Sequence, residues 1–449
     1  MMLRMLAHRN ATRAILAACA IWLCPVFALA DDRAPLSANA IENPEALART
    51  TDVEQLVTDA LDGGLTRHEA VTVALLNNAE LRAQLQALGI AGAQLAQARR
   101  YSNPELDLSL QFPEHQRGNE LEIELLWNLA DLWRVPPRKD MARADYHRTV
   151  AQVSSAVLNT VADARRAHDQ CVILSAVRRQ SDALMAAVRD LRDQIYARFE
   201  YGYTTELERS HADADVSRAA MEFAESDAAV RVAIAGLRRI LGLGPDVGME
   251  IAGDLPGLPD TLWDEADLAA YALTHRPDLR AARLGVRVSE ASLALERRST
   301  WGAVSLGPAY TQEPDSSALF GLALSVELPV ADDNRAMRAK ASVELHQSRA
   351  SLSAMEAQVR EDVAVALARL DLAMDNERLL RTEIIPACQR AVDHVTLQYN
   401  QMQLNLSDVF KERVALNEAM KEHLLARLRL QAALVELEFV VGGRLPAGP

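Results

Sequence analysis

Apolar and polar residues alternate strictly in two stretches of the segment 104–133. Every second position is apolar along 106–112 and again along 121–127. A period of two places these apolar side chains on one face of a sheet and the intervening residues on the other. The intervening residues are mostly carboxylates: Glu105, Asp107, Glu120, Glu122 and Glu124. The pattern predicts two strands, at about 104–113 and 119–129, joined by a polar connection.

A strand pair of this kind fits two different settings. Its apolar face is compatible with half-burial on a soluble core, the commoner arrangement among proteins. It is equally compatible with the wall of a membrane barrel, where lipid covers the apolar side and water the acidic side.

Helical patterns surround the strand pair. Thr66 and Glu69 form a capping-box sequence that opens a helix expected to run to about Arg100. After two prolines, residues 138–201 contain neither Gly nor Pro. They predict one helix over about 138–200, roughly 95 Å long, which implies a coiled coil or a helical barrel. A returning helix is expected to end near Leu241.

The chain then repeats itself at an offset of about 200 residues. Three pairs of segments correspond: NNAELRA (77–83) with HRPDLRA (275–281), VADARRAHD (161–169) with VAVALARLD (363–371), and AGLRRILG (235–242) with VELEFVVG (435–442). Such duplication indicates a repeated structural unit.

The repeat divides the mature chain into three parts. The first repeat spans 65–246, a linker spans 247–264, and the second repeat with its C-terminal tail spans 265–449. The second repeat predicts strands at about 303–311 and 318–328 and a long helix over about 334–400. Pro308 would cost the first of these strands a ladder hydrogen bond unless it lies at a bulge or an edge. Pro386 is expected to kink the long helix.

The N-terminus has the pattern of a secretory signal. A basic region and an apolar run precede Ala28-Leu29-Ala30, which predicts a signal peptide over 1–30 and a leader with an equatorial segment over 31–64. A lipoprotein-type sequence ending at Cys19 is the less favoured alternative, because few apolar residues precede it. No later run of eighteen apolar residues predicts a transmembrane helix.

Composition excludes several classes of function. The formal net charge of −14 argues against nucleic acid as a partner. Cys171 and Cys388 remain after signal removal, fall in separate helical stretches, and are expected to stay as free thiols. No spacing of His, Cys or Ser predicts a metal site, a cofactor site or a catalytic nucleophile, so we expect no enzyme activity.

Four strands are too few to close a membrane barrel, and an open sheet would leave unpaired edges in lipid. A membrane setting therefore requires several copies of the chain to share one barrel, with the five carboxylates facing its lumen. Aromatic residues cluster near the predicted strand ends, as at a membrane interface: Tyr101, Trp127, Trp133 and Trp301. The alternative is that these are ordinary core aromatics at a domain junction.

The sequence resembles the TolC-type outer-membrane factors, the outer membrane efflux protein family. The resemblance rests on LTRHEAVTVALLNNAELRA (65–83), HRPDLRAAR (275–283), the two-fold repeat and VVGGRLP (440–446). It implies a mainly α fold with a membrane β-barrel, in which a homotrimer forms a 12-stranded barrel and a 12-helix periplasmic tunnel. The implied partners are a periplasmic adaptor (membrane fusion) protein, an inner-membrane pump such as an RND transporter, and outer-membrane lipid.

The implied function is a passive exit duct for tripartite efflux, located in the outer membrane of a Gram-negative bacterium. The tail at 399–410 is similar to the heavy-metal efflux branch of the family, although nothing in the predicted lumen distinguishes metal ions from drugs or secreted peptides. The alternatives are a type I protein secretion duct and a periplasmic coiled-coil adaptor or scaffold; a soluble enzyme is less favoured still.

Family members gate the tunnel at the tip, where helix–turn–helix junctions converge. The corresponding junctions here are 201–205 and 401–405. The resemblance therefore marks seven tip or gate candidates: Gly202, Thr204, Glu206, Glu208, Met402, Asn405 and Asp408. Inward acids would form a cation-attracting ring under three-fold symmetry. Ordinary solvated acids on a helix surface are an equally good explanation for each one.

Overall fold

The structure is a computed structural model that describes residues 57, 63–112, 120–253, 255, 257, 263–300, 302–313, 318–330, 332–401, 403–443 and 445. The predicted signal peptide, Cys19, nearly all of the leader, Trp301 and Met402 lie outside the described residues. Two compact units are present. The helical unit combines Met1–Ala83, Ala156–Arg276 and Val359–Pro449, and the sheet-bearing unit combines Gln84–Ser155 and Pro277–Gln358.

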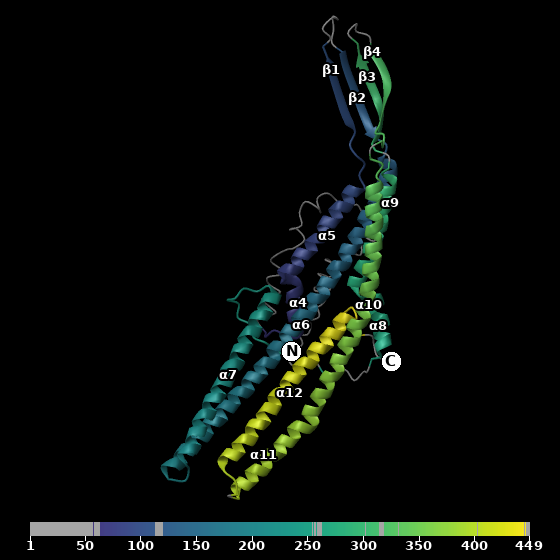
Figure 1. The fold of residues 1–449 in the computed structure, drawn as a ribbon. Coiled ribbons are helices and arrows are strands. Elements are labelled where there is room, and N and C mark those ends of the chain that lie inside the picture. The colour runs from purple at the N-terminus through teal and green to yellow at the C-terminus, as the bar shows by residue number, and fades with distance from the viewer. Residues whose placement is uncertain are drawn as a thin grey trace, which may run out of the picture. The chain divides into compact units, whose positions relative to one another are not determined.

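The sheet-bearing unit contains four antiparallel strands in the order β1-β2-β3-β4 (Figure 1). They are β1 (Glu105–Gln111), β2 (Glu120–Asn128), β3 (Val304–Gln312) and β4 (Ala318–Val326). All four predicted strands are confirmed, with ends within two residues of the prediction.

One face of this sheet is apolar across all four strands. Leu108 lies opposite Ile123, Ile123 opposite Tyr310, and Tyr310 opposite Phe320. The face is open, since Leu108 is 61% exposed and Phe320 83% exposed. Large apolar side chains this accessible are unusual for a soluble surface and indicate a covering partner.

The other face changes character from one strand pair to the next. Asp107 lies directly opposite Glu124, but the residues that continue this row on β3 and β4 are Ala309 and Gly321. The predicted asymmetry, an acidic first pair beside an uncharged second pair, is therefore present in the register.

Pro308 lies at neither a bulge nor an edge, and the ladder is interrupted there, as expected for a proline within a strand. It sits within β3, between β2 and β4. The β2–β3 ladder omits the pairs that would join Leu125 and Leu126 to Pro308 and Gly307, while its register is unchanged on both sides. A Cβ on Gly307 would lie 1.7 Å from the Leu125 carbonyl oxygen, so only glycine permits this approach.

The first long helix, α6 (Asp131–Glu200), begins seven residues earlier than predicted. Pro136 and Pro137 lie within it, where each lacks the N–H that would bond four residues back. The Trp133 carbonyl, which Pro137 leaves unpaired, accepts a hydrogen bond of 3.4 Å from Arg298. A replacement donor thus makes the proline tolerable, and the sequence pattern did not show it.

The helix expected over about 66–100 is two helices, α4 (Arg67–Asn77) and α5 (Ala79–Ala98). The break at Asn78 has ψ 121°. In the second repeat, α8 (Glu265–His275) and α9 (Pro277–Arg298) are broken in the same way at Arg276, with ψ 122°.

Both breaks contact the end of a returning helix in the same repeat. Asn78 donates to the Ile240 carbonyl at the end of α7 (Glu206–Leu241), 2.8 Å away. Arg276 donates to the Val440 carbonyl at the end of α12 (Leu406–Val440), 3.5 Å away. The break residues therefore satisfy carbonyls that a helix end leaves free, which supports the internal repeat by structure as well as sequence.

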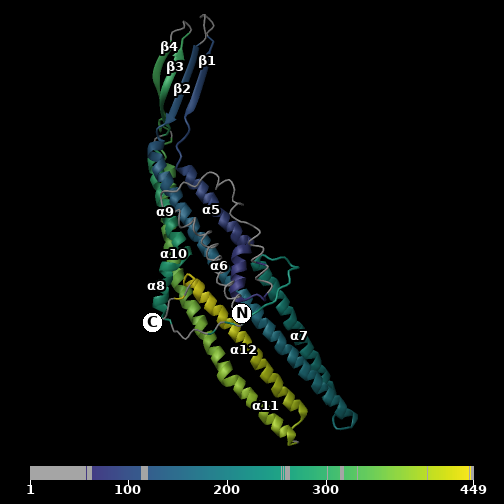
Figure 2. The same cartoon turned by 180° about the vertical axis from the view of Figure 1, so that it is seen from behind.

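The second long helix is divided into α10 (Arg335–Leu379), a π-helical turn η2 (Leu380–Ile384) and α11 (Ile385–Asn400). The π turn comes directly before Pro386, where a kink was predicted. In the helical unit, α7 runs beside α6 and α12 beside α11, as two hairpins (Figures 1 and 2).

Within the part of the chain that the structure describes, no helix is both long enough and apolar enough to cross a membrane.

Candidate functional site

The first hairpin turn is built by a helix stop followed at once by a helix start. Gly202 adopts φ +74°, and the N–H groups of Gly202 and Tyr203 bond to Phe199 and Arg198, the pattern of a Schellman motif. Thr205 then caps α7 in a capping box with Glu208. The tight turn therefore follows from a glycine and a Thr-x-x-Glu sequence.

The second turn has the same plan. The Gln403 N–H bonds to the Gln398 carbonyl, 3.0 Å away. The Asp408 carboxylate accepts a hydrogen bond from the Asn405 N–H, 3.3 Å away, at the start of α12. The two turns thus end two hairpins that are equivalent in the repeat.

The three acids suggested for the gate all have partners close by in sequence. Glu206 pairs with Arg209, 3.3 Å away, and Glu208 accepts the Thr205 N–H. Asp408 accepts the Asn405 N–H and also pairs with a lysine one turn later. These contacts account for the acids as helix-capping and helix-surface groups, and their role in a gate stays a prediction.

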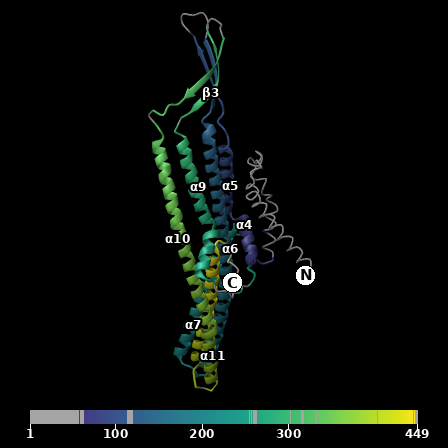
Figure 3. The ribbon, with the colours of Figure 1, turned by 90° about the vertical axis from the view of Figure 1, so that its right-hand side faces the viewer.

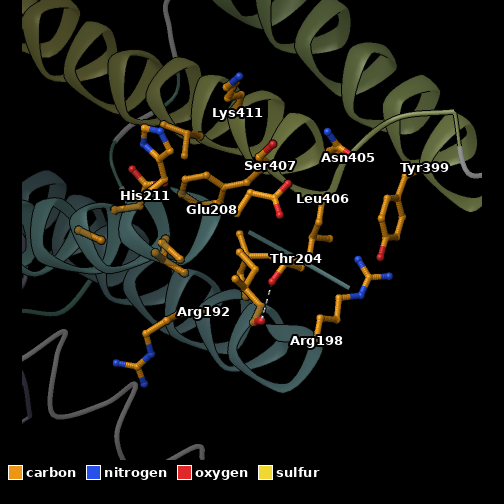
Figure 4. A pocket seen from close by; sticks show the side chains of 18 of the residues that line it. Arg192, Arg198, Thr204, Glu208, His211, Tyr399, Asn405, Leu406, Ser407 and Lys411 are labelled. Atoms are coloured by element: carbon orange, nitrogen blue, oxygen red, sulfur yellow. Dashed lines mark hydrogen bonds between the residues drawn. The ribbon is translucent and has the colours of Figure 1, made fainter. Parts of the chain in front are cut away.

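A groove of about 1040 Å³ lies between the two hairpins near their turns. Its lining comes from α6, α7, α11 and α12 and mixes apolar side chains with charged ones (Figure 4). Of the predicted tip residues, Thr204, Glu208 and Asn405 line the groove. Gly202, Glu206 and Asp408 belong to the turns but do not line it.

Several contacts join the two hairpins in and beyond this groove. The Arg198 guanidinium lies 5.7 Å from the centre of the Tyr399 ring, a cation–π contact visible in Figure 4. Phe410 packs on a small buried cluster formed by α6 and α7. Farther from the turns, Lys421 forms an ion pair of 2.7 Å with Glu222.

These linking residues were missed by the sequence analysis. The repeat offset of about 200 could have identified two of the pairs, because positions 198 and 399 differ by 201, and positions 222 and 421 by 199. Residues at matching places in two copies of a hairpin come together when the hairpins pack side by side.

The remaining candidates lie in the sheet-bearing unit. The five acids share one sheet face by register: Glu105, Asp107, Glu120, Glu122 and Glu124. Tyr101 and Trp127 are exposed beside the strand ends, and Trp133 is partly exposed in the first turn of α6.

Burial shifts the pKa of several titratable groups outside the strands. Burial raises the pKa of the Cys171 thiol to about 12. Burial, followed by the nearby Arg143, lowers the pKa of His147. Among the described residues, no group of three or more His, Cys, Asp or Glu side chains is arranged to hold a metal ion.

Comparison with known proteins shows which proteins are similar to this chain. Residues 268–443, within the second repeat, match the family model for outer membrane efflux proteins. No significant match was found among curated protein sequences.

Several solved structures share the fold. CusC is 16% identical, with a TM-score of 0.72 over 84% of this chain and 92% of its own. The Campylobacter jejuni outer membrane channel CmeC is 14% identical, with a TM-score of 0.71 over 84% and 85%. The Neisseria gonorrhoeae outer membrane channel MtrE is 18% identical, with a TM-score of 0.68 over 84% and 89%.

The fold is therefore that of the outer membrane efflux channels. Together with the family match over the second repeat, it supports an outer membrane efflux protein.

Proposed function

We propose that this chain is one subunit of a homotrimeric outer-membrane exit duct that passively conducts substrate delivered by an inner-membrane pump through a periplasmic adaptor. The observation that carries the proposal is the sheet, which exposes a continuous apolar face while its opposite face carries carboxylates. The family match over the second repeat supports the same function.

The sheet needs further copies to be stable in lipid. β1 and β4 are its edge strands, and unpaired edge groups are not tolerated in the hydrocarbon layer. Three copies joined edge to edge close a 12-stranded barrel, a size within the known range. Its leucine-rich face then meets lipid, and the five carboxylates line an acidic lumen.

The helices extend the duct into the periplasm of a Gram-negative bacterium. We propose that the adaptor docks at the two hairpin turns. The proposed tip or gate residues lie at these turns: Gly202, Thr204, Glu206, Glu208, Met402, Asn405 and Asp408. Transport by diffusion through a water-filled lumen requires no covalent chemistry and no cofactor from this chain. The similarity of its tail to heavy-metal efflux components makes metal ions the first substrate to test, before drugs and secreted peptides.

A periplasmic coiled-coil adaptor is the second candidate, because the hairpins alone would suit it. The exposed apolar sheet face favours the duct, since an adaptor working in water gains nothing from it.

Membrane fractionation separates the two candidates. The duct is expected to sediment with outer membranes, to require detergent for extraction, and to have the mass of three chains in detergent. A periplasmic protein of known solubility serves as the control in the same fractionation. Recovery of this chain in the soluble periplasmic fraction would eliminate the duct.

A further inference from the structure

Basic residues crowd at the four helix ends that adjoin the sheet. α5 ends and α6 begins on either side of the β1–β2 pair, and α9 ends and α10 begins on either side of the β3–β4 pair. Segments 99–100, 131–143, 296–298 and 332–340 together hold eleven Lys or Arg but only five Asp or Glu, in a chain of net charge −14. We call these basic residues the basic collar: Arg99, Arg100, Arg134, Arg138, Lys139, Arg143, Arg297, Arg298, Arg335, Arg338 and Lys340.

Hydrogen bonds hold the four helix ends in one layer (Figure 3). Arg138 of α6 donates to the carbonyl of Ala98, the last residue of α5, 3.2 Å away. Arg298 at the end of α9 donates to the Trp133 carbonyl of α6. Asn334, just before α10, donates to the Glu296 carbonyl of α9, 2.9 Å away. The collar is thus a built layer beside the sheet, not a scatter of charges along the sequence.

Helix electrostatics account for four of the eleven collar residues. Basic residues are favourable at the C-terminal ends of α5 and α9, because the helix dipole is negative there. At the N-terminal ends of α6 and α10 the dipole favours acids, and Asp131 in the first turn of α6 provides one. The arginines nearby have partners within the chain. Arg134 donates to the Gly302 carbonyl, Arg335 pairs with Asp333, and Arg338 donates to the Asn334 carbonyl. The arginines at these N-terminal ends are therefore held by contacts within the chain.

Part of the collar is free to bind an external anion. Arg99, Arg100 and Arg297 are exposed, and their side chains form no ion pair within the described part of the chain. Apolar side chains are exposed in or beside the same segments: Tyr101, which follows Arg100 in the chain, is 61% accessible, and Leu132, in the first turn of α6, is 62% accessible. Basic groups beside exposed apolar and aromatic ones are typical of the level where hydrocarbon meets lipid headgroups.

The height of the sheet agrees with that level. The nine residues of β2 span about 30 Å, or roughly 23 Å once tilted as in a membrane barrel. This matches the apolar band of about 25 Å in such barrels. The collar then lies at the headgroups of the leaflet on the helical side.

We propose that the basic collar binds the phosphate groups of anionic phospholipids in this leaflet and so fixes the depth of the duct in the bilayer. The proposal rests on the membrane placement of the sheet. Arg99, Arg100 and Arg297 supply unpaired guanidinium groups for the phosphates, and Tyr101 and Leu132 contact the adjoining acyl chains.

Lipid-specific fluorescence quenching tests the collar in the full-length protein. The trimer is reconstituted in vesicles of phosphatidylcholine containing brominated phosphatidylglycerol or brominated phosphatidylcholine, and quenching of tryptophans such as Trp127 and Trp133 reports lipid contact. We expect brominated phosphatidylglycerol to bind beside the tryptophans at least about threefold more strongly than brominated phosphatidylcholine. One basic residue near an anionic surface strengthens binding by up to about fivefold. In the triple variant R99Q/R100Q/R297Q the two lipids should quench equally.

A matched variant removes three exposed charges elsewhere. R179Q/R189Q/R390Q alters arginines of the helical unit that are exposed and form no ion pair among the described residues, and it should keep the preference. Equal quenching of the unaltered protein by both lipids, or a preference that survives in the collar variant, would overturn the proposal. Absence of quenching by either lipid in folded protein would instead refute the membrane placement, and the collar's role with it.

Discussion

The ion pair between Glu222 and Lys421 is expected to hold the two hairpins together and so to favour the closed duct. It joins α7 to α12 at 2.7 Å, and its side chains are only 27% and 33% exposed. A partly exposed pair is worth about 0.5–1 kcal/mol after screening by solvent. Reversing one charge replaces this attraction by a repulsion of similar size.

Lys421→Glu should therefore shift the balance toward separated hairpins by about 1–2 kcal/mol per chain. Since 1.4 kcal/mol is a factor of ten, the open-to-closed ratio should rise roughly 5- to 30-fold for each chain. Single-channel recording in planar bilayers measures this ratio directly. The effect should shrink in 1 M salt, where the screening length falls to about 3 Å.

The charge-swapped double variant provides the control. Glu222→Lys with Lys421→Glu restores an ion pair in the reverse orientation and should bring the open fraction back toward that of the unaltered protein. An open fraction unchanged by Lys421→Glu alone, or one that the swap fails to restore, would refute the proposed link between this contact and closure.

Three further predictions concern thiols, a glycine and a helix cap. At pH 8 only about one Cys171 side chain in ten thousand is a thiolate, because burial raises its pKa to about 12. A thiol reagent should therefore label only Cys388 in folded protein and both cysteines after unfolding. Gly242→Ala should lower the melting temperature, because Gly242 has φ +67° and the new Cβ would lie 2.4 Å from the Asn77 carbonyl oxygen. The control Gly236→Ala, within α7, places a Cβ that meets nothing within 4 Å and should raise the melting temperature. Thr205→Ala should cost about 1 kcal/mol of helix stability and speed hydrogen exchange at the first turn of α7, while exchange near Leu241 stays unchanged.

Local pattern predicted the strands and turns well, because their determinants are close together in sequence. Alternation located all four strands, and Gly202 with Thr205 marked the first hairpin turn. The breaks at Asn78 and Arg276 were missed, because their stabilising partners are carbonyls more than 160 residues away. The start of α6 was misplaced for a similar reason, since Arg298 supplies the hydrogen bond that Pro137 cannot.

The candidate site was predicted in position but not in its contacts. The turns at 201–205 and 401–405 do lie beside one groove, yet the residues that link its walls, including Arg198, Tyr399 and Phe410, come from the packing of two hairpins. The capping contacts of Glu208 and Asp408 were legible in the sequence as Thr-x-x-Glu and Asn-x-x-Asp. The prediction that the five sheet acids share one face required only the period-two alternation of the sequence.

Ion conductance of the purified protein in a planar bilayer tests the central claim most directly. A trimeric, water-filled duct should produce discrete conductance steps that scale with salt concentration and favour cations, as its acidic lumen predicts. Neutralising the acidic row with E120Q/E122Q/E124Q should reduce the cation preference while keeping the steps. Protein that reconstitutes into the bilayer as a folded trimer but never conducts would contradict the account.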